Sequence, residues 1–284
     1  MIKATMNTSR LSHMGCLLLL VAQQAMAAEL IALLNTPVQG ALVIGRTDPA
    51  AIVSLDGTRL PLTADGRFVF GLGRNATKKS LLHARLPDGH EQSLLVQPKA
   101  RQYAIERIDG LPPATVTPPP ELSARISREA RLVSAARAST RHSDDWAMPF
   151  IWPAEGRISG VYGSQRVLNG EPRRPHYGVD VAAPTGTEVV APADGVVVLA
   201  EPDLYYSGGT IIIDHGDGVS STFLHLDTVE VCVGQQLAQG TRIGSIGASG
   251  RATGPHLDWR MNWREQRVDP RLLLEPDAWQ PGTQ

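Results

Sequence analysis

The sequence predicts a mainly β protein with a small N-terminal immunoglobulin-like β-sandwich, one connecting helix and a larger C-terminal antiparallel β-sheet or barrel. Short runs rich in β-branched residues recur along most of the chain, and Asp-Gly pairs separate many of them. Helical periodicity appears in one segment only, after residue 120. With 284 residues, of which 42% are hydrophobic and 19% charged, the chain is long enough for two domains.

The first 27 residues have the pattern of a cleaved secretory signal. Lys3 and Arg10 precede an apolar run over residues 15–22, and Ala25 and Ala27 supply the small residues that signal peptidase needs. The run is shorter than the roughly 20 residues that span a bilayer. We therefore expect export to the periplasm or cell envelope, with no transmembrane segment after cleavage.

The mature chain would keep one cysteine, Cys232, which excludes an internal disulfide. Its formal net charge would change from −1 to −3, because the signal contains two basic residues and no acidic one. Such a small charge gives no electrostatic basis for binding nucleic acid, so we expect no nucleic-acid partner.

Residues 28–100 are expected to form the sandwich. The predicted strands are 41–44, 51–55, 67–70, 81–86 and 93–96. Asp56-Gly57, Asp65-Gly66 and Asp88-Gly89 lie between them, and Asp-Gly tolerates the positive φ of a hairpin turn. The segment is short for this class, so the number of strands stays open. It contains no cluster of catalytic residue types.

Residues 101–147 are expected to hold a linker and a basic amphipathic helix. Residues 101–108 alternate in the manner of one more possible strand. A proline-rich, extended stretch follows over 111–120. The helix should begin at Glu121, with the apolar stripe Leu122, Ile126, Val133 and Ala136. The opposite face carries Arg125, Arg128, Arg131 and Arg137. This face is either solvated or docks on an acidic wall polymer or on the next domain.

Residues 148–278 are expected to form the second β domain. The predicted strands are 187–190, 195–200, 210–213, 221–225 and 242–246, and a further short strand follows Gly254-Pro255. The pattern indicates an antiparallel barrel or double sheet with a groove lined by loops. His215, between two aspartates and next to glycines, is interpreted as a turn histidine.

Five metal-competent or proton-transferring side chains lie in this region. His176 and Asp180 are four residues apart, His225 ends a predicted strand, and His256 and Asp258 project from one face of another. A zinc hydrolase needs three protein ligands and an open position for water. It also needs one group to take a proton and one to stabilise the oxyanion. Five groups are required and five are present.

The motifs around these residues resemble a known family. His176-x-x-x-Asp180, Leu224-His225-Leu226, the stretches 233–244 and 247–256, and Val268-Asp269-Pro270 are similar to the lysostaphin or LytM-type zinc metallopeptidases, which cut peptides in bacterial peptidoglycan. The resemblance covers nearly all of residues 152–269 and implies a peptidase domain of the duplicated hybrid motif type. The preceding sandwich, linker and helix are similar to the N-terminal region of exported members.

The resemblance also implies a role for each residue. His176 and Asp180 would be zinc ligands, His225 would stabilise the oxyanion, and His256 would activate or orient the attacking water. The family's pattern ends in His-x-His, whose last histidine is the third ligand, whereas this chain has Asp258 there. A carboxylate also binds zinc, at about 2.0–2.2 Å. Arg260 is a candidate to hold Asp258 in place.

The replacement by Asp258 leaves two functions open. Two carboxylates cancel the formal charge of zinc, so an active enzyme would be slower or have a higher pH optimum. The chain is then an exported zinc endopeptidase acting on peptidoglycan peptides. Alternatively, it is a catalytically silent module that binds the cell wall or activates a separate wall hydrolase, with a cell-envelope protein as partner. A third interpretation is a wall-binding scaffold led by the sandwich.

Overall fold

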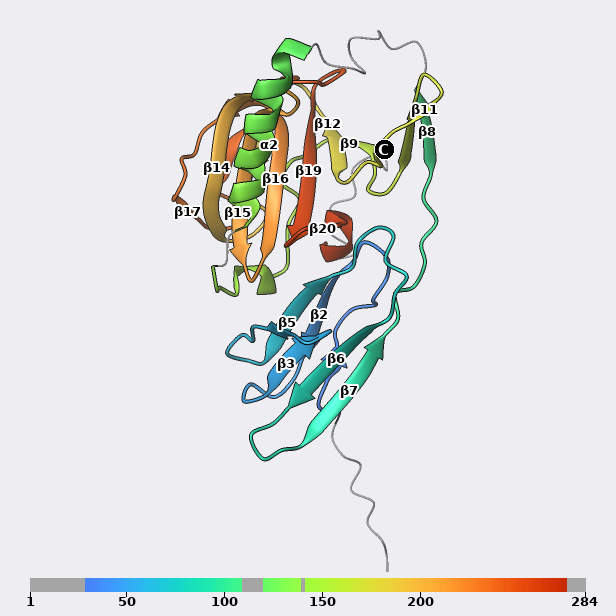
Figure 1. The fold of residues 1–284 in the computed structure, drawn as a ribbon. Coiled ribbons are helices and arrows are strands. Elements are labelled where there is room, and N and C mark those ends of the chain that lie inside the picture. Colours follow the sequence, from blue (N-terminus) through green and yellow to red (C-terminus); the bar gives the residue numbers. More distant parts are fainter. Residues whose placement is uncertain (1–28, 109–119, 139–140, 275–284) are drawn as a thin grey trace, which may run out of the picture.

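The computed structural model describes residues 29–108, 120–138 and 141–274. The predicted signal and most of the proline-rich stretch lie outside the described residues. The described strands form an N-terminal body and a larger C-terminal body that lies above it in the view of Figure 1, and a single long helix lies against the C-terminal body. The expected mainly β architecture with one connecting helix is confirmed. No helix in the described ranges is long and apolar enough to cross a membrane.

The N-terminal body is a sandwich of two antiparallel sheets. Its strands are β1 (Ala32–Leu33), β2 (Leu42–Arg46), β3 (Ile52–Leu55), β4 (Thr58–Leu60), β5 (Arg67–Gly71), β6 (Ser80–Arg85) and β7 (Glu91–Val96). They are ordered β1-β2-β5 and β4-β3-β6-β7. The buried side chains of Phe68, Phe70 and Leu82 fill the space between the sheets. Asp56 and Gly57 turn the β3–β4 hairpin with φ of 48° and 81°, as the Asp-Gly pair predicts.

The segment after the sandwich does not belong to its sheets. Strand β8 (Ile105–Ile108) pairs in parallel with β10 (Gln165–Leu168), which pairs with β11 (Glu171–Pro172). This small sheet lies beside the C-terminal body (Figure 1). The expected division at residues 100 and 148 therefore stays a prediction.

The predicted helix is present as a 3₁₀ turn, η1 (Pro120–Leu122), followed by α2 (Ser123–Arg137). Val133 and Ala136 pack against a small apolar cluster of Leu199, Leu204 and Ile212. Its arginines do not form one solvated face, because Arg125 forms an ion pair with Asp203 and Arg137 donates a hydrogen bond to Thr222. Part of the basic face thus docks on the C-terminal body, as one of the two interpretations proposed.

The C-terminal body is built on a ten-stranded sheet. Its strands are β9 (Arg157–Gly160), β12 (Val179–Ala182), β13 (Glu188–Val190), β14 (Gly195–Leu204), β15 (Gly208–Gly216), β16 (Val219–Val229), β17 (Gln236–Leu237), β18 (Arg242–Ile246), β19 (His256–Trp263) and β20 (Gln266–Val268). The order is β17-β14-β15-β16-β19-β12-β9, with β13 on β18, β18 on β16 and β20 on β19. Two 3₁₀ turns, η2 (Asp145–Ala147) and η3 (Pro270–Leu273), flank it. Ile211, Phe223 and Trp259 are fully buried on the core side.

The interpretation of His215 as a turn histidine is wrong. Strand β15 extends beyond the predicted 210–213, and His215 lies within it with no exposed surface. Its Nδ1 lies 2.6 Å from the carbonyl oxygen of Asp194, and its Nε2 lies 2.8 Å from the hydroxyl of Ser221. His215 is a core histidine with both ring nitrogens satisfied.

Candidate metal centre

Strand pairing places two carboxylates opposite one another. Strands β12 and β19 are antiparallel, and in their register Asp180 lies directly across from Asp258. Directly opposed residues of an antiparallel pair share one face of the sheet. His176 lies just before β12, where its N–H donates to the carbonyl of Ser164 and its own carbonyl accepts from the N–H of Gly163. Both sides of the His176 peptide are therefore held in place.

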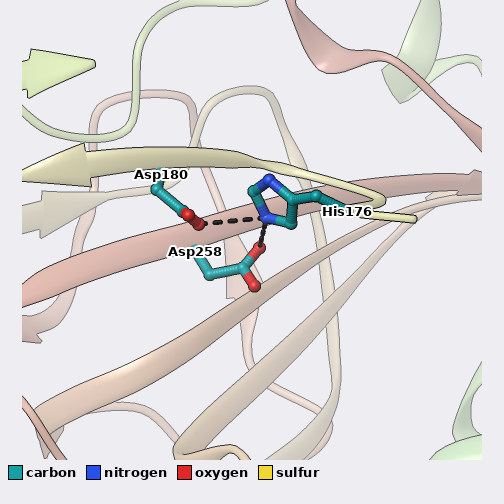
Figure 2. Close-up of side chains that lie close together, drawn as sticks. All are labelled: His176, Asp180 and Asp258. Atoms are coloured by element: carbon teal, nitrogen blue, oxygen red, sulfur yellow. Dashed lines mark ion pairs between the residues drawn. The ribbon is translucent and has the colours of Figure 1, made fainter. Parts of the chain in front are cut away.

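The three side chains converge on a single point (Figure 2). His176 Nε2 lies 3.1 Å from Asp180 Oδ1 and 3.5 Å from Asp258 Oδ1. All three residues are buried, and the ligand atoms that they offer lie within 4.8 Å of one another. Three atoms bound at about 2.1 Å to a tetrahedral ion stand about 3.4 Å apart. The residues present therefore fit a zinc ion.

Two glycines leave room for this convergence. A Cβ on Gly160 would collide with the carboxylate of Asp180, and a Cβ on Gly178 would collide with that of Asp258. Neither glycine has the positive φ of a left-handed turn, so the close approach of the carboxylates is the reason that both positions lack a side chain. These glycines were not predicted as site residues. The proximity of Gly160 to Asp180 and of Gly178 to Asp258 follows from strand pairing, which local spacing does not reveal.

Arg260 holds the aspartate that replaces the expected histidine. Its Nε lies 3.0 Å from Oδ1 and 3.1 Å from Oδ2 of Asp258, and its Nη2 lies 2.5 Å from Oδ2. Burial would raise the pKa of Asp258, but the positive charges of Arg260 and His176 outweigh it and hold that pKa well below its usual range. Asp258 is therefore an anion in the fold, as a ligand must be.

The two carboxylates raise the pKa of His176, whereas the positive charges lower that of Asp258. Burial alone would lower the pKa of His176, but hydrogen bonding and charge from Asp180 and Asp258 raise it to about 9. A cation at this point is favoured, whether it is a proton on the imidazole or a metal ion.

His225 and His256 form a second pair beside the carboxylates, with ring centroids 4.8 Å apart. Nδ1 of His225 lies 2.9 Å from the carbonyl oxygen of Ser249, and Nδ1 of His256 lies 2.8 Å from that of Gly254. Because a carbonyl only accepts, each Nδ1 carries a proton and each Nε2 stays available for proton transfer. Burial lowers the pKa of His225.

The backbone at His225 is strained. Its φ is 66°, in the left-handed region that non-glycine residues rarely occupy, at an irregularity of β16. Such strain persists where the surrounding structure fixes a residue for function. Leu224 pairs with Asp258, so the histidine pair directly adjoins the three ligand candidates. The structure thus brings all five predicted residues together.

Comparison with known proteins agrees with this arrangement. Residues 174–270 match the model of Peptidase family M23. The matched segment, here called the M23 domain, contains all five candidate residues. This agrees with the LytM-type resemblance of the motifs.

Curated proteins similar to the M23 domain include a peptidoglycan DD-endopeptidase and a cell division protein. The chain is 39% identical over 123 residues to the peptidoglycan DD-endopeptidase ShyA of Vibrio cholerae, a match that covers 43% of this chain and 28% of ShyA. It is 28% identical over 171 residues to the cell division protein DipM of Caulobacter vibrioides, covering 56% of this chain and 26% of DipM. The chain thus spans only about a quarter of the length of these curated relatives.

A solved structure extends the likeness beyond the M23 domain. A Pseudomonas aeruginosa protein assigned to peptidase M23 superposes with a TM-score of 0.64 at 29% identity. The match covers 85% of this chain and 96% of that one, so it includes much of the N-terminal sandwich.

Proposed function

We propose that this protein is an exported zinc metalloendopeptidase that hydrolyses peptide bonds in bacterial peptidoglycan. The observation that carries the proposal is the convergence of His176, Asp180 and Asp258, all buried, beside the histidine pair. A bound zinc ion would act as a Lewis acid on the scissile carbonyl and on water. The names of the relatives support peptidoglycan as substrate, and the N-terminal sequence supports export.

Each residue of the chain has a distinct task in this proposal. His176, Asp180 and Asp258 hold the metal, and the Gly160 and Gly178 backbones leave them room. The Nε2 of His256 accepts the proton of the attacking water. His225 donates a hydrogen bond from Nε2 to the developing oxyanion only when its ring carries a second proton there, a state that the negative charge of the oxyanion favours. The carbonyls of Gly254 and Ser249 fix the two rings in the orientation that presents Nε2.

Arg260 changes the expected charge of the centre. Two carboxylates and a neutral histidine contribute −2, and Arg260 returns one positive charge through its contact with Asp258. The sum is −1, the same as for two histidines and one carboxylate. The charge argument for a slower enzyme, drawn from the ligands alone, therefore loses its basis when Arg260 is counted.

The test combines metal content with cleavage. Purified protein is expected to contain one zinc per chain and to release peptides from isolated peptidoglycan, and His225→Ala or His256→Ala should reduce release by about a hundredfold or more. His90→Ala, on the exposed β6–β7 hairpin of the sandwich, is the control and should leave release unchanged. Protein that holds no zinc and cleaves nothing would refute the proposal.

The second candidate is a catalytically silent module that binds the wall or activates another hydrolase. One observation favours it: Arg260 already occupies both oxygens of Asp258, so the centre holds a permanent positive charge without a metal. In this case Asp180→Ala should preserve the cellular role of the protein. Loss of that role in a folded Asp180→Ala variant would argue for the enzyme.

A further inference from the structure

A cavity of about 720 Å³ lies between the C-terminal half of α2 and the β19–β20 hairpin. Arg137 lines it from the helix, and Trp263 and Arg267 line it from the hairpin. Neither the proposed metal centre nor the histidine pair includes any of these residues. The cavity therefore needs an explanation of its own.

The cavity opens on the sheet face that carries the metal centre. In the β16–β19 register Arg260 lies opposite Thr222, and Asp258 lies on the same face because it is two residues from Arg260. Arg137 reaches down from α2 to this face, where its Nη2 lies 3.3 Å from Thr222 Oγ1. A peptide bound at the metal centre could thus extend along the face toward the cavity.

Three arginines meet at this place without enough negative charge. Burial, followed by repulsion from Arg267 and Arg260, lowers the pKa of Arg137 to about 9. Burial, followed by repulsion from Arg260, lowers the pKa of Arg267 to about 10. Arg260 has Asp258 as its counter-ion. In the described part of the chain, Arg137 and Arg267 form no ion pair.

The partners of the two uncompensated arginines are neutral. Arg267 donates to the side-chain oxygen of Asn262 at 2.9 Å, and among the described residues Arg137 donates to the hydroxyl of Thr222 alone. The Nε of Arg137 is buried and has no hydrogen-bond partner within the ranges that the structure describes. Glu265 also lines the cavity, but it is exposed and pairs with neither arginine in the described ranges. A half-buried guanidinium without a counter-ion is costly, so an anion in the cavity would compensate both arginines.

We propose that this cavity is a binding site for the carboxylate of the peptide substrate, held by Arg137 and Arg267. The proposal rests on the proposed function for the identity of the substrate. A guanidinium presents a planar fork of donors that matches the two oxygens of a carboxylate. The stem peptides of peptidoglycan end in a carboxylate. The backbone of such a peptide can lie along the sheet face between the metal centre and the cavity.

The test measures binding of an N-acetylated peptide ending in D-Ala-D-Ala to the purified protein, by calorimetry. The peptide is offered as the free acid and as the C-terminal amide, each with and without a zinc chelator. The acid should bind about tenfold more tightly than the amide, as expected for charge-assisted hydrogen bonds. Arg137→Gln and Arg267→Gln should each remove most of this preference. Arg131→Gln, which removes an exposed arginine of the same helix, should keep it.

Several outcomes would overturn the proposal. These are equal affinity for acid and amide, an unchanged preference in both glutamine variants, or a preference that vanishes with the chelator, which would place the carboxylate on the metal. Binding of inorganic phosphate is measured in the same way. If phosphate binds through Arg137 and Arg267 while the acid and the amide bind equally well, the cavity is a phosphate site and not a carboxylate site.

Two further controls keep the test decisive. If a glutamine variant does not fold, Arg137→Lys and Arg267→Lys keep the charge but lose the fork, and each should weaken the preference. An undiminished preference in both lysine variants would contradict the proposal. Failure of the proposed function is seen separately, because a protein that neither holds zinc nor cleaves peptidoglycan would still show the acid preference with chelator present.

Discussion

At the scale of single residues, Asp258 and Arg260 behave as one unit. The guanidinium contacts both carboxylate oxygens; Asp258 is buried, and Arg260 is partly exposed. A buried charged pair of this kind tolerates loss of one partner poorly, because the other is left uncompensated. The position of the ligand and the charge beside it cannot be changed independently.

This coupling predicts the result of restoring the expected histidine. Asp258→His alone should not tighten zinc binding, because Arg260 would then face the metal without its carboxylate. Adding Arg260→Gln to Asp258→His should raise zinc affinity at least about tenfold over the single variant, since a point charge near a divalent cation costs several kcal/mol even at an effective dielectric constant of about 20. Zinc affinity is measured by competition with a chromophoric chelator.

The matched control for this pair is Arg131→Gln in the Asp258→His background, which removes an equal charge from the exposed face of α2. It should leave zinc affinity as it is in the single variant. Tighter binding by Asp258→His alone, with no further gain from Arg260→Gln, would show that the two residues act independently.

At the scale of elements, α2 is fixed by a polar contact as well as by apolar packing. The carboxylate of Glu129 forms an ion pair with Arg125 at 2.6 Å and accepts a hydrogen bond from the backbone N–H of Tyr205 at 2.8 Å. Tyr205 begins the short loop between β14 and β15. The carboxylate therefore joins the helix to the loop that leads into the central strands.

Glu129→Ala should destabilise the docked helix by about 1–3 kcal/mol, because it leaves the N–H of Tyr205 without its acceptor and Arg125 without one of its two carboxylates. The measurement is hydrogen exchange at the Tyr205 amide together with urea unfolding. Glu121→Ala, in the exposed first turn before α2, is the control. Unchanged exchange at Tyr205 would show that apolar packing alone holds the helix.

The buried histidine of β15 predicts a dependence of stability on acidity. Burial lowers the pKa of His215 to about 4, from an unfolded value near 6.5. Stability from the neutral ring is therefore fully present above about pH 6.5 and is lost as the pH falls toward 4. The loss should reach about 3 kcal/mol, with a lower Tm in acid. In His215→Asn this part of the acid sensitivity should disappear, and an equally steep loss in that variant would contradict the assignment.

At the scale of the whole molecule, the sandwich and the M23 domain share a polar contact. Arg101 Nη2 lies 2.8 Å from Asp269 Oδ2, and the Asp269 side chain is only 3% exposed. The N–H of Asp269 donates to the carbonyl of Gly40, between β1 and β2 of the sandwich. Asp269 follows β20, so the contact ties the sandwich to the hairpin that borders the cavity.

Arg101→Ala should cost about 3 kcal/mol, because it leaves the carboxylate of Asp269 buried without its partner. Urea unfolding should then show the sandwich and the M23 domain separating into two transitions. Arg46→Ala breaks the exposed pair with Asp65 and should cost less than about 1 kcal/mol. Equal effects of the two variants would mean that the buried pair contributes nothing to the junction.

The local sequence pattern is enough to predict the five site residues, but it does not predict the residues packed around them. Alternation along a strand is enough to place His256 and Asp258 on one face, and spacing is enough to select His176 and Asp180. Strand pairing is not local, so the opposition of Asp180 to Asp258 and the need for Gly160 could not be deduced from spacing.

The same limit applies to the fold. The Asp-Gly turns and the start of the helix near Glu121 are local signals, and the structure confirms both. The burial of His215 depends on how far β15 extends, and the docking of Arg137 depends on Thr222, 85 residues further along the chain. Contacts at such separations leave no periodic signature in one sequence.

The parallel pairing of β8 with β10 has a consequence for how this protein can be recombined with its relatives. Strand β8 follows the sandwich directly, yet its partner lies within the C-terminal body. An exchange of N-terminal regions between homologues that cuts between β7 and β8 would keep this pair native. A cut made after β8 would bring in a foreign strand, and β10 would have to accept it or present an open edge to neighbouring molecules. Functional chimaeras should therefore have their junctions at residues 97–104.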